Sequence, residues 1–193
     1  MTVLHSENEY AIIQKLPGEE CEHELPTLIA NALGGEAYCV HRLDRAVGGV
    51  MVYARTKAAA ASLSEQMQSG AFEKEYLAVV AGKPEQNEGE LRDFLFKDSL
   101  KNRAFVVKTK RSGVKEARLS YRVLAGGVYD GREISLVRVK LHTGRFHQIR
   151  CQFSSRKMPL LGDGKYGSRE KCPIALLSCH ISFEHPKTHE RVS

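Results

Sequence analysis

Apolar residues along the chain alternate with polar ones or form short runs, a pattern that predicts strands more often than helices. Two predicted strands, 37–43 and 49–55, are joined around Asp44, and we expect Gly48-Gly49 to supply the turn. The other predicted strands are 10–16, 72–82, 90–96, 104–109, 117–125, 132–141 and 175–185. Because these strands do not alternate regularly with helices, the pattern indicates an α+β protein with a mixed, largely antiparallel β-sheet and flanking helices.

Three segments have the composition and the end signals of helices, namely 25–35, 56–70 and 146–157. The clearest is 56–70, because Thr56 can cap its N-terminus, alanines fill its interior and Gly70 stands at its end. The chain contains no internal repeat and no low-complexity linker. We therefore expect a single domain over residues 1–193, with room for two lobes.

Composition narrows the setting. The 193 residues, 42% of them hydrophobic, can bury one sizeable core or two small ones. The net charge of +6 favours a polyanionic partner such as nucleic acid, although many other proteins share it. Five cysteines without close pairs are typical of free thiols in a reducing compartment. No signal peptide opens the chain and no apolar run reaches the roughly 20 residues of a membrane span, so we expect a cytoplasmic protein without a membrane partner.

Asp44 is an acid with basic neighbours on both sides. Asp44 is flanked by Arg42 and Arg45, just before a glycine pair and an apolar run. Burial raises the pKa of a carboxyl group and neutralises it, whereas a nearby guanidinium holds it charged. A structural ion pair explains this arrangement, and so does a carboxylate kept charged for chemistry.

The segment LHTGRFHQIRCQF (141–153) predicts the end of a strand, a turn and a helix. On that helix Phe146, Ile149 and Phe153 form an apolar stripe, and His147, Arg150 and Ser154 form the adjacent face. Arg150 therefore lies beside buried residues, should be partly desolvated and needs an acid partner. Without further information, a phosphate-binding basic helix, or simply a solvated face, is the more common explanation of such a segment.

Two further features have ordinary explanations. Tyr76 shares one side of the strand at 72–82 with Phe72 and Lys74, where a tyrosine most often packs in a core and less often stacks on a base. The glycine-rich segment LLGDGKYG (160–167) lacks the spacing of a phosphate loop and predicts a tight loop.

A metal site fits the sequence poorly. His185 and His189 have a zinc-like spacing, but no C-x₂₋₄-C partner occurs in the chain. His142, His147 and Cys151 could converge only by an accident of helix phase. We expect neither a metal nor a cofactor.

Five short motifs follow one another along most of the chain. They are KLPG (15–18), HRLD (41–44) with Gly49 behind it, KEYLAVVAG (74–82), LHTGRFHQIRCQF (141–153) continued by PLLGDGKYG (159–167), and LLSCHISFEHPKT (176–188). In this order they resemble motifs of the RluA-type pseudouridine synthases, which isomerise uridine within structured RNA. The family motifs are K-P-x-G, H-R-L-D-x-x-T-S-G, K-x-Y-x-x-x-x-x-G, T-G-R-x-H-Q-I-R with P-I-x-G-D-x-x-Y-G, and L-H-x-x-x-L-x-F-x-H-P-x-T.

The chain departs from these motifs at four places. Leu16 is inserted in the first motif, Val47-Gly48 replaces Thr-Ser, Gln152 stands where the family often has His, and Leu177 replaces the His of the last motif. Gly48 gives the loop after Asp44 more conformational freedom, and the acid itself is retained. No segment resembles the small S4 domain that recognises RNA, so we expect recognition by the catalytic domain alone.

The resemblance implies the pseudouridine synthase catalytic-domain fold and an isomerase acting on specific uridines of ribosomal or transfer RNA. Asp44 would be the catalytic acid, Arg150 its buried ion-pair partner, Tyr76 the ring that stacks on the target base, and Arg42 the side chain that holds the flipped nucleotide out. The further candidate substrate-binding residues are Arg45, Arg145, His147 and Ile149. The reaction breaks the N1–C1′ bond and joins C5 to C1′, so one carboxylate suffices, either adding to C1′ or removing a ribose proton. We expect a monomer.

Two alternatives remain. The altered Val47-Gly48 loop is compatible with an RNA-binding protein of the same fold that has lost catalysis, although Asp44, Tyr76 and Arg150 are all present. A metal-dependent hydrolase that uses the histidine-rich segments would be sensitive to chelators, unlike an isomerase.

Overall fold

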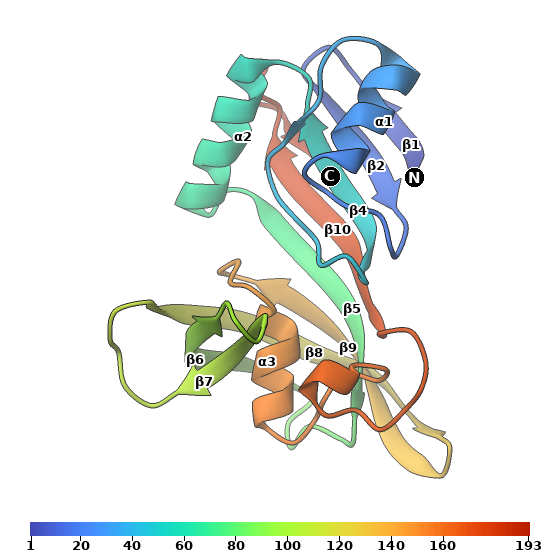
Figure 1. The fold of residues 1–193 in the computed structure, drawn as a ribbon, viewed down its shortest axis with the longest axis vertical. Coiled ribbons are helices and arrows are strands. Elements are labelled where there is room, and N and C mark those ends of the chain that lie inside the picture. The colour runs from blue at the N-terminus through green and yellow to red at the C-terminus, as the bar shows by residue number, and fades with distance from the viewer. The chain divides into compact units, whose positions relative to one another are not determined.

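The computed structural model describes all 193 residues and separates the chain into two compact units. Unit 1 comprises Met1–Lys74 and Leu177–Ser193, and unit 2 comprises Glu75–Leu176. The chain passes from one unit to the other inside two strands, β5 (Glu73–Ala81) and β10 (Leu176–Glu184), which are labelled in Figure 1. No helix is both long enough and apolar enough to cross a membrane.

Unit 1 is built on a small mixed sheet. Its strands follow the order β1 (Thr2–Ser6), β2 (Tyr10–Lys15), β4 (Gly48–Ala54) and β10. Neighbouring strands are antiparallel except β4 and β10, which run parallel. Two short strands, β3 (Tyr38–Cys39) and β11 (Arg191–Val192), pair with β4 and β10.

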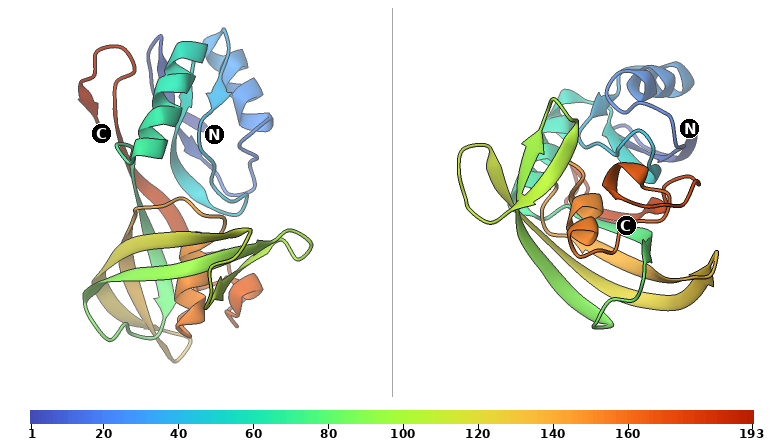
Figure 2. Two further views of the ribbon diagram at one scale, coloured as in Figure 1. Left: turned by 90° about the vertical axis from the view of Figure 1, so that its left-hand side faces the viewer. Right: turned by 60° about the horizontal axis from the view of Figure 1, so that its bottom comes forward.

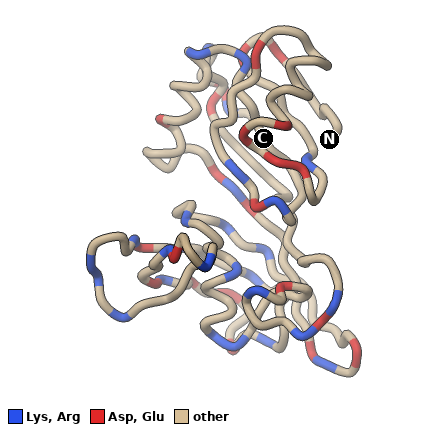
Figure 3. The backbone as a smooth tube through the Cα atoms, viewed as in Figure 1, with Lys and Arg blue, Asp and Glu red and all other residues tan.

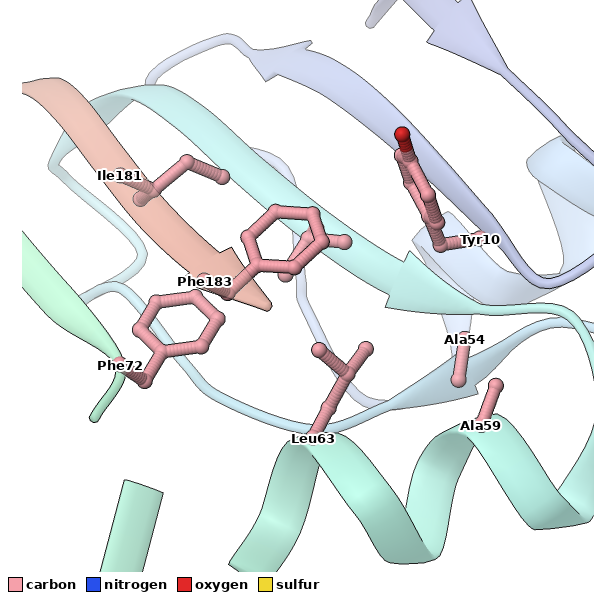
Figure 4. Close-up of a cluster of buried hydrophobic side chains, with 8 residues drawn as sticks. Tyr10, Ala54, Ala59, Leu63, Phe72, Ile181 and Phe183 are labelled. Carbon is pink, nitrogen blue, oxygen red and sulfur yellow. The ribbon is translucent and has the colours of Figure 1, made fainter. Parts of the chain in front are cut away.

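Two helices cover this sheet, α1 (Glu24–Leu33) and α2 (Lys57–Ser69), and they lie on opposite sides of it in Figure 2. Successive side chains of a strand point to opposite faces. Val52 and Ala54 of β4 therefore belong to the cluster with Leu63 of α2, which Figure 4 shows together with Phe72 and Phe183. Met51 and Tyr53 point the other way and contact Cys21, just ahead of α1.

In unit 2 every pair of neighbouring strands is antiparallel. Its strands follow the order β5, β9 (Arg132–Leu141), β8 (Val114–Tyr129), β6 (Glu88–Asp98) and β7 (Arg103–Val107). The strands curve around the helix α3 (Gln148–Ser155), as Figure 2 shows. Phe153 of α3 packs edge-to-face against Tyr121 of β8, with ring centroids 5.8 Å apart. A 3₁₀ turn, η1 (Gly164–Tyr166), follows α3.

Most predicted elements are confirmed, and the α+β class with a mixed, largely antiparallel sheet is correct. The helix at 56–70 has the predicted ends, because the Thr56 hydroxyl accepts a hydrogen bond from the Ala59 N–H and Gly70 adopts the left-handed conformation. The strands β1 and β11 were not predicted, since each is a short edge strand with little apolar pattern.

The prediction around Asp44 is wrong in two details. The strand at 37–43 shrinks to Tyr38–Cys39, because the chain beyond it contacts β4 through a side chain: the Nε2 atom of His41 accepts a hydrogen bond from the Val52 N–H. Gly48 and Gly49 do not form the turn but open β4. The turn lies one step earlier and is closed by a 2.8 Å hydrogen bond from the Val47 N–H to the Asp44 carbonyl.

The prediction of an apolar stripe and an adjacent polar face on a helix at 146–157 is also wrong. Phe146 and His147 precede α3, and six of the eight residues of α3 are buried, so the helix has no solvated face. Two of its polar side chains donate hydrogen bonds to residues within β6 and β8. Gln148 donates to the Arg118 carbonyl, and Gln152 donates to the Leu91 carbonyl and to the Asp93 carboxylate.

Candidate active site

The predicted site residues divide between the two units. Unit 1 holds Asp44 with Arg42 and Arg45 on the loop ahead of β4. Unit 2 holds Tyr76 on β5 and Arg150 on α3. Unit 2 also holds Arg145, His147 and Ile149. Each group is built by its own unit.

Lys15 organises the loop that carries Asp44. This lysine is only 1% exposed, and its ammonium group donates hydrogen bonds to the carbonyl oxygens of Val47 (2.7 Å) and Arg45 (3.1 Å). It also reaches the carbonyls of Leu16 (3.1 Å) and Asp44 (3.5 Å). A cation bound to the carbonyls of Asp44 and of two residues that follow it fixes the backbone of the turn from which the Asp44 side chain extends.

Burial lowers the pKa of Lys15, and the nearby acids Glu19, Asp44 and Glu24 offset part of that effect. The lysine thus combines a buried positive charge with a place beside the candidate catalytic carboxylate.

Gly18, the last residue of the KLPG motif, forms hydrogen bonds to the same loop. The Gly18 N–H donates to the Arg45 carbonyl at 2.7 Å, and Nε of Arg45 donates to the Gly18 carbonyl at the same distance. Part of the Arg45 guanidinium therefore has a structural task. Arg42, in contrast, is exposed and pairs with Glu22 at 3.2 Å.

The altered residues after Asp44 fit their surroundings. A Cβ atom at Gly48 would lie 3.1 Å from the Lys15 carbonyl and 3.1 Å from Cδ of Pro17, so a larger residue would crowd the proline ring. Gly49 has a φ of 124°, and a Cβ there would lie 2.1 Å from the Ser178 carbonyl. Only glycine permits this approach of β4 to β10, which accounts for Gly49 in the motif.

His41, three residues before Asp44, contacts β4 and Phe72. It is buried, and burial together with Lys74 lowers the pKa of its imidazole well below 6.5. Because Nε2 accepts the Val52 N–H, the ring proton resides on Nδ1, which has no hydrogen-bond partner. His41 is therefore a neutral packing residue against Phe72, with ring centroids 5.5 Å apart.

In unit 2, Arg150 has the acid partner that its position demands. It is 8% exposed, and it forms a bidentate ion pair with Asp163, whose carboxylate is 2% exposed. Nε donates to Oδ2 at 2.7 Å and Nη2 donates to Oδ1 at 2.8 Å. The prediction of a desolvated, acid-paired arginine is confirmed, and Asp163 is a partner that the sequence did not reveal. The pairing of Arg150 with Asp44 remains a prediction.

Tyr166 ties the surroundings of Arg150 together. The guanidinium of Arg150 lies over its ring, 5.0 Å from the centroid. The Tyr166 hydroxyl accepts the Ala104 N–H at 2.7 Å and lies 3.0 Å from Nδ1 of His147. Burial raises the pKa of Tyr166 to about 12, so the hydroxyl keeps its proton and can donate it to Nδ1. His147 is thereby held in a left-handed conformation (φ 51°) ahead of α3.

The other predicted residues of unit 2 occupy varied places. Tyr76 lies in β5 and is 6% exposed. Ile149 is buried in α3, and Nε of Arg145 donates to the Glu116 carbonyl at 2.8 Å. These positions leave the roles of the three residues as predictions.

Sequence reasoning missed Lys15, Asp163 and Tyr166. Lys15 had a signal, since it opens the KLPG motif, and the other two lie in the segment 160–167 that was interpreted only as a tight loop. That segment does turn tightly, at η1. Its one acid and one tyrosine were the available signal, because an acid that becomes buried between two glycines needs a partner.

Glu7, Glu9 and His185 form the group of side chains that most resembles metal ligands. Nδ1 of His185 accepts the N–H groups of Lys187 and Thr188, so Nε2 carries the ring proton and donates it to Glu7 at 3.1 Å. A metal at this place would have to displace that proton. The predicted spacing partner His189 is not in the group.

Comparison with known proteins assigns the family. Residues 9–155 match the family described as RNA pseudouridylate synthase. A protein of Aquifex aeolicus named as an uncharacterized RNA pseudouridine synthase is 37% identical over 162 residues, which cover 78% of this chain and 50% of that protein. The dual-specificity RNA pseudouridine synthase RluA of Vibrio parahaemolyticus is 34% identical over 154 residues, covering 78% of this chain and 61% of that protein.

Among solved structures, human RNA pseudouridylate synthase domain containing 1 has the same fold, with a TM-score of 0.86 and 24% identity over 99% of this chain and 80% of that one. The chain spans about half the length of the curated relatives it matches. The fold and the matched motifs agree, and the chain belongs to the RluA-type RNA pseudouridylate synthase family.

Proposed function

We propose that this chain is an RNA pseudouridine synthase, an isomerase that converts specific uridines of structured ribosomal or transfer RNA to pseudouridine. The observation that carries the proposal is the turn at Asp44. The buried Lys15 donates hydrogen bonds to carbonyls of this turn, and Gly18 of the KLPG motif donates another. The backbone that carries the Asp44 side chain is therefore fixed. A carboxylate held in one place is what an attack on C1′ or the removal of a ribose proton requires.

The proposed reaction is balanced without any added group. The N1–C1′ bond of uridine breaks, the uracil turns, a C5–C1′ bond forms, C5 loses its proton and N1 gains one. Asp44 takes part at the ribose in one of two ways: it adds to C1′ as N1 leaves and is displaced when C5 attacks C1′, or it removes a ribose proton and returns it when the C5–C1′ bond forms. Nothing is oxidised or reduced, so the chemistry asks for an ionised carboxylate and a means of holding the base.

Tyr76 and Arg150 complete the proposal. Tyr76 would stack on the target base, and Arg150 would hold Asp44 in its charged form. The ion pair with Asp163 supports this role, because it orients the guanidinium before any substrate arrives. Arg42 is exposed and paired only with an exposed acid, so it can leave Glu22 to enter the RNA. Arg45, Arg145, His147 and Ile149 would flank the bound nucleotide.

The proposal includes the setting of the enzyme. All five cysteines are free thiols, which supports a reducing compartment such as the cytoplasm. We propose that the chain is a monomer.

The decisive experiment uses RNA from a strain that lacks the gene, incubated with the purified chain. Pseudouridine positions are then mapped against the same RNA incubated with the Asp44→Asn variant. We expect new pseudouridines at a few defined positions with the parent and none with the variant. If the parent binds this RNA and forms no pseudouridine at any position, the protein is an RNA-binding relative without catalysis.

A further inference from the structure

The two units have opposite net charge. Unit 2 carries 21 Lys and Arg against 11 Asp and Glu, a formal net charge of +10, whereas unit 1 carries 8 against 12, a net charge of −4. The chain's excess of +6 therefore conceals a strongly basic unit and an acidic one. A polyanion that binds this protein has its electrostatic attraction to unit 2.

Within unit 2 the positive charge is concentrated in one segment, residues 97–115, which we call the basic arm. The arm comprises the end of β6, the turn to β7, β7 itself and the loop that leads into β8. It contains seven cations and one acid, Asp98, so its formal net charge is +6. The cations are Lys97, Lys101, Arg103, Lys108, Lys110, Arg111 and Lys115. In Figure 3 the loops of this segment carry blue at several points.

The cations of the basic arm have no acidic partners. None of the seven is in an ion pair, whereas Arg92, Arg132 and Arg156, elsewhere in unit 2, pair with Glu116, Glu170 and Asp93. All seven except Arg103 are exposed. Like charges crowded on one short segment repel one another, so the fold gains nothing from this arrangement unless an anion offsets it.

Aromatic rings hold some of these cations in place. The guanidinium of Arg111 lies 5.4 Å from the ring centroid of Phe96, and Lys101 and Arg103 lie 5.9 and 5.2 Å from that of Phe105. A cation over a ring is ordered and still has its hydrogen-bond donors available. The basic arm therefore combines cations that lie over rings with the exposed lysines Lys108 and Lys110, which contact neither a ring nor an acid.

We propose that the basic arm binds the phosphate backbone of the RNA substrate and contributes a large part of its affinity, apart from the residues that handle the target uridine. The inference rests on the proposed function for the identity of the polyanion. Lysines and arginines without acidic partners are the groups that neutralise phosphates and release their counterions. Binding through the arm would then survive the loss of the catalytic acid.

The test compares two triple variants with the same change in net charge. The arm variant carries Lys108→Gln, Lys110→Gln and Arg111→Gln. The control variant carries Lys57→Gln, Lys83→Gln and Lys187→Gln, three exposed lysines outside the arm. Binding of an unmodified transfer RNA transcript is measured over a range of salt concentrations, and circular dichroism checks that both variants are folded.

We expect the arm variant to bind about tenfold or more weakly near physiological salt, with a log–log salt slope smaller by about two to three, because each lost phosphate contact removes roughly 0.7–0.9 from the slope. The control should stay within about threefold of the parent, with a slope changed by less than one. Equal RNA affinities and equal salt slopes for the two triple variants would overturn the proposal. Binding to anionic lipid vesicles is measured in parallel, and an arm variant that loses lipid binding but keeps RNA binding would overturn it as well.

Failure of this proposal is distinguishable from failure of the proposed function. If the parent forms pseudouridine while the arm and control variants bind RNA alike, the arm is not the phosphate contact and the function stands. If the parent binds RNA through the arm and forms no pseudouridine, the function falls and the arm stands.

Discussion

The guanidinium of Arg150 and the carboxylate of Asp163 form a buried bidentate ion pair, with N–O distances of 2.7 and 2.8 Å. Asp163 belongs to the glycine-rich segment after α3, where Gly162 adopts a φ of 77° and a Cβ would lie 2.3 Å from the Pro173 carbonyl. The tight turn thus serves to bring an acid under the helix. Arg150 is consequently oriented within unit 2 by a partner of its own.

This pair leads to the first prediction. Asp163→Asn should lower the free energy of unfolding by roughly 3–5 kcal/mol, because it removes the charge of the bidentate partner of a buried guanidinium. Adding Arg150→Met removes the guanidinium as well and should recover part of the loss, without restoring pseudouridine formation. Urea unfolding of the three proteins measures these differences. A double variant no more stable than Asp163→Asn would show that the pair is not the cause.

The second prediction concerns the acid itself. Asp44→Asn retains the size of the side chain and removes its charge, so pseudouridine formation should fall to background while RNA affinity changes by less than about threefold. The loss of stability should be smaller than for Asp163→Asn, because Arg150 keeps its bidentate partner. Asp130→Asn, in the exposed turn between β8 and β9, is the matched control and should retain full activity. Measurable turnover by Asp44→Asn on an RNA that the parent modifies would contradict the assignment.

The third prediction separates stacking from chemistry at Tyr76. Tyr76→Phe should keep most of the binding of a substrate RNA, whereas Tyr76→Ala should lose about 1–3 kcal/mol of it, as expected for one base–aromatic contact. Affinity is measured by fluorescence anisotropy, with the exposed Tyr129→Ala as control. Similar affinities for the Phe and Ala variants would exclude a stacking role.

The fourth prediction assigns a positioning role to Lys15. Lys15→Met keeps the length of the side chain but removes the lysine donor from the Val47 carbonyl and one of the two donors to the Arg45 carbonyl, so the free energy of unfolding should fall by about 1.5–3 kcal/mol. Because the turn at Asp44 loses its anchor, kcat should fall up to about 100-fold while RNA affinity is nearly unchanged. Lys187→Met, at an exposed lysine, should show neither effect. If Lys15→Met loses the expected stability while its kcat is unchanged, Lys15 stabilises the fold and does not position Asp44.

The fifth prediction is a dependence of stability on pH. The pKa of His41 is well below 6.5 in the folded protein, because burial and Lys74 disfavour the charged ring. As the pH falls from about 6.5 toward that lower pKa, His41 binds a proton in the unfolded chain but stays neutral in the folded protein. His41 should therefore reduce stability in this window by up to about 1.4 kcal/mol per pH unit.

Unfolding of His41→Gln at several pH values tests this prediction. Glutamine can still accept the Val52 N–H but does not titrate, so the variant should lose less stability between pH 6.5 and 4.5 than the parent. Parallel curves for the two proteins would show that His41 does not titrate differently in the folded state.

The sequence by itself determined the elements whose signals are local. Alternation of apolar residues specified the long strands, and the Thr56 cap and Gly70 bounded α2, because these effects act over a few neighbouring residues. The order of the five motifs was also enough to predict the family, including Asp44, Tyr76 and Arg150. An acid partner for Arg150 could be expected from its place beside apolar residues.

Only the tertiary structure decided which groups meet across long separations in the chain. The donors and acceptors that Lys15 and Gly18 bring to the turn at Asp44 come from about 30 residues away. Asp163 reaches Arg150 through a turn whose geometry depends on contacts with Pro173. Likewise most of α3 is buried because strands curve around it, so polar residues of this helix form internal hydrogen bonds. Burial and hydrogen-bond partners are properties of the packed chain, and they are absent from any local pattern of residues.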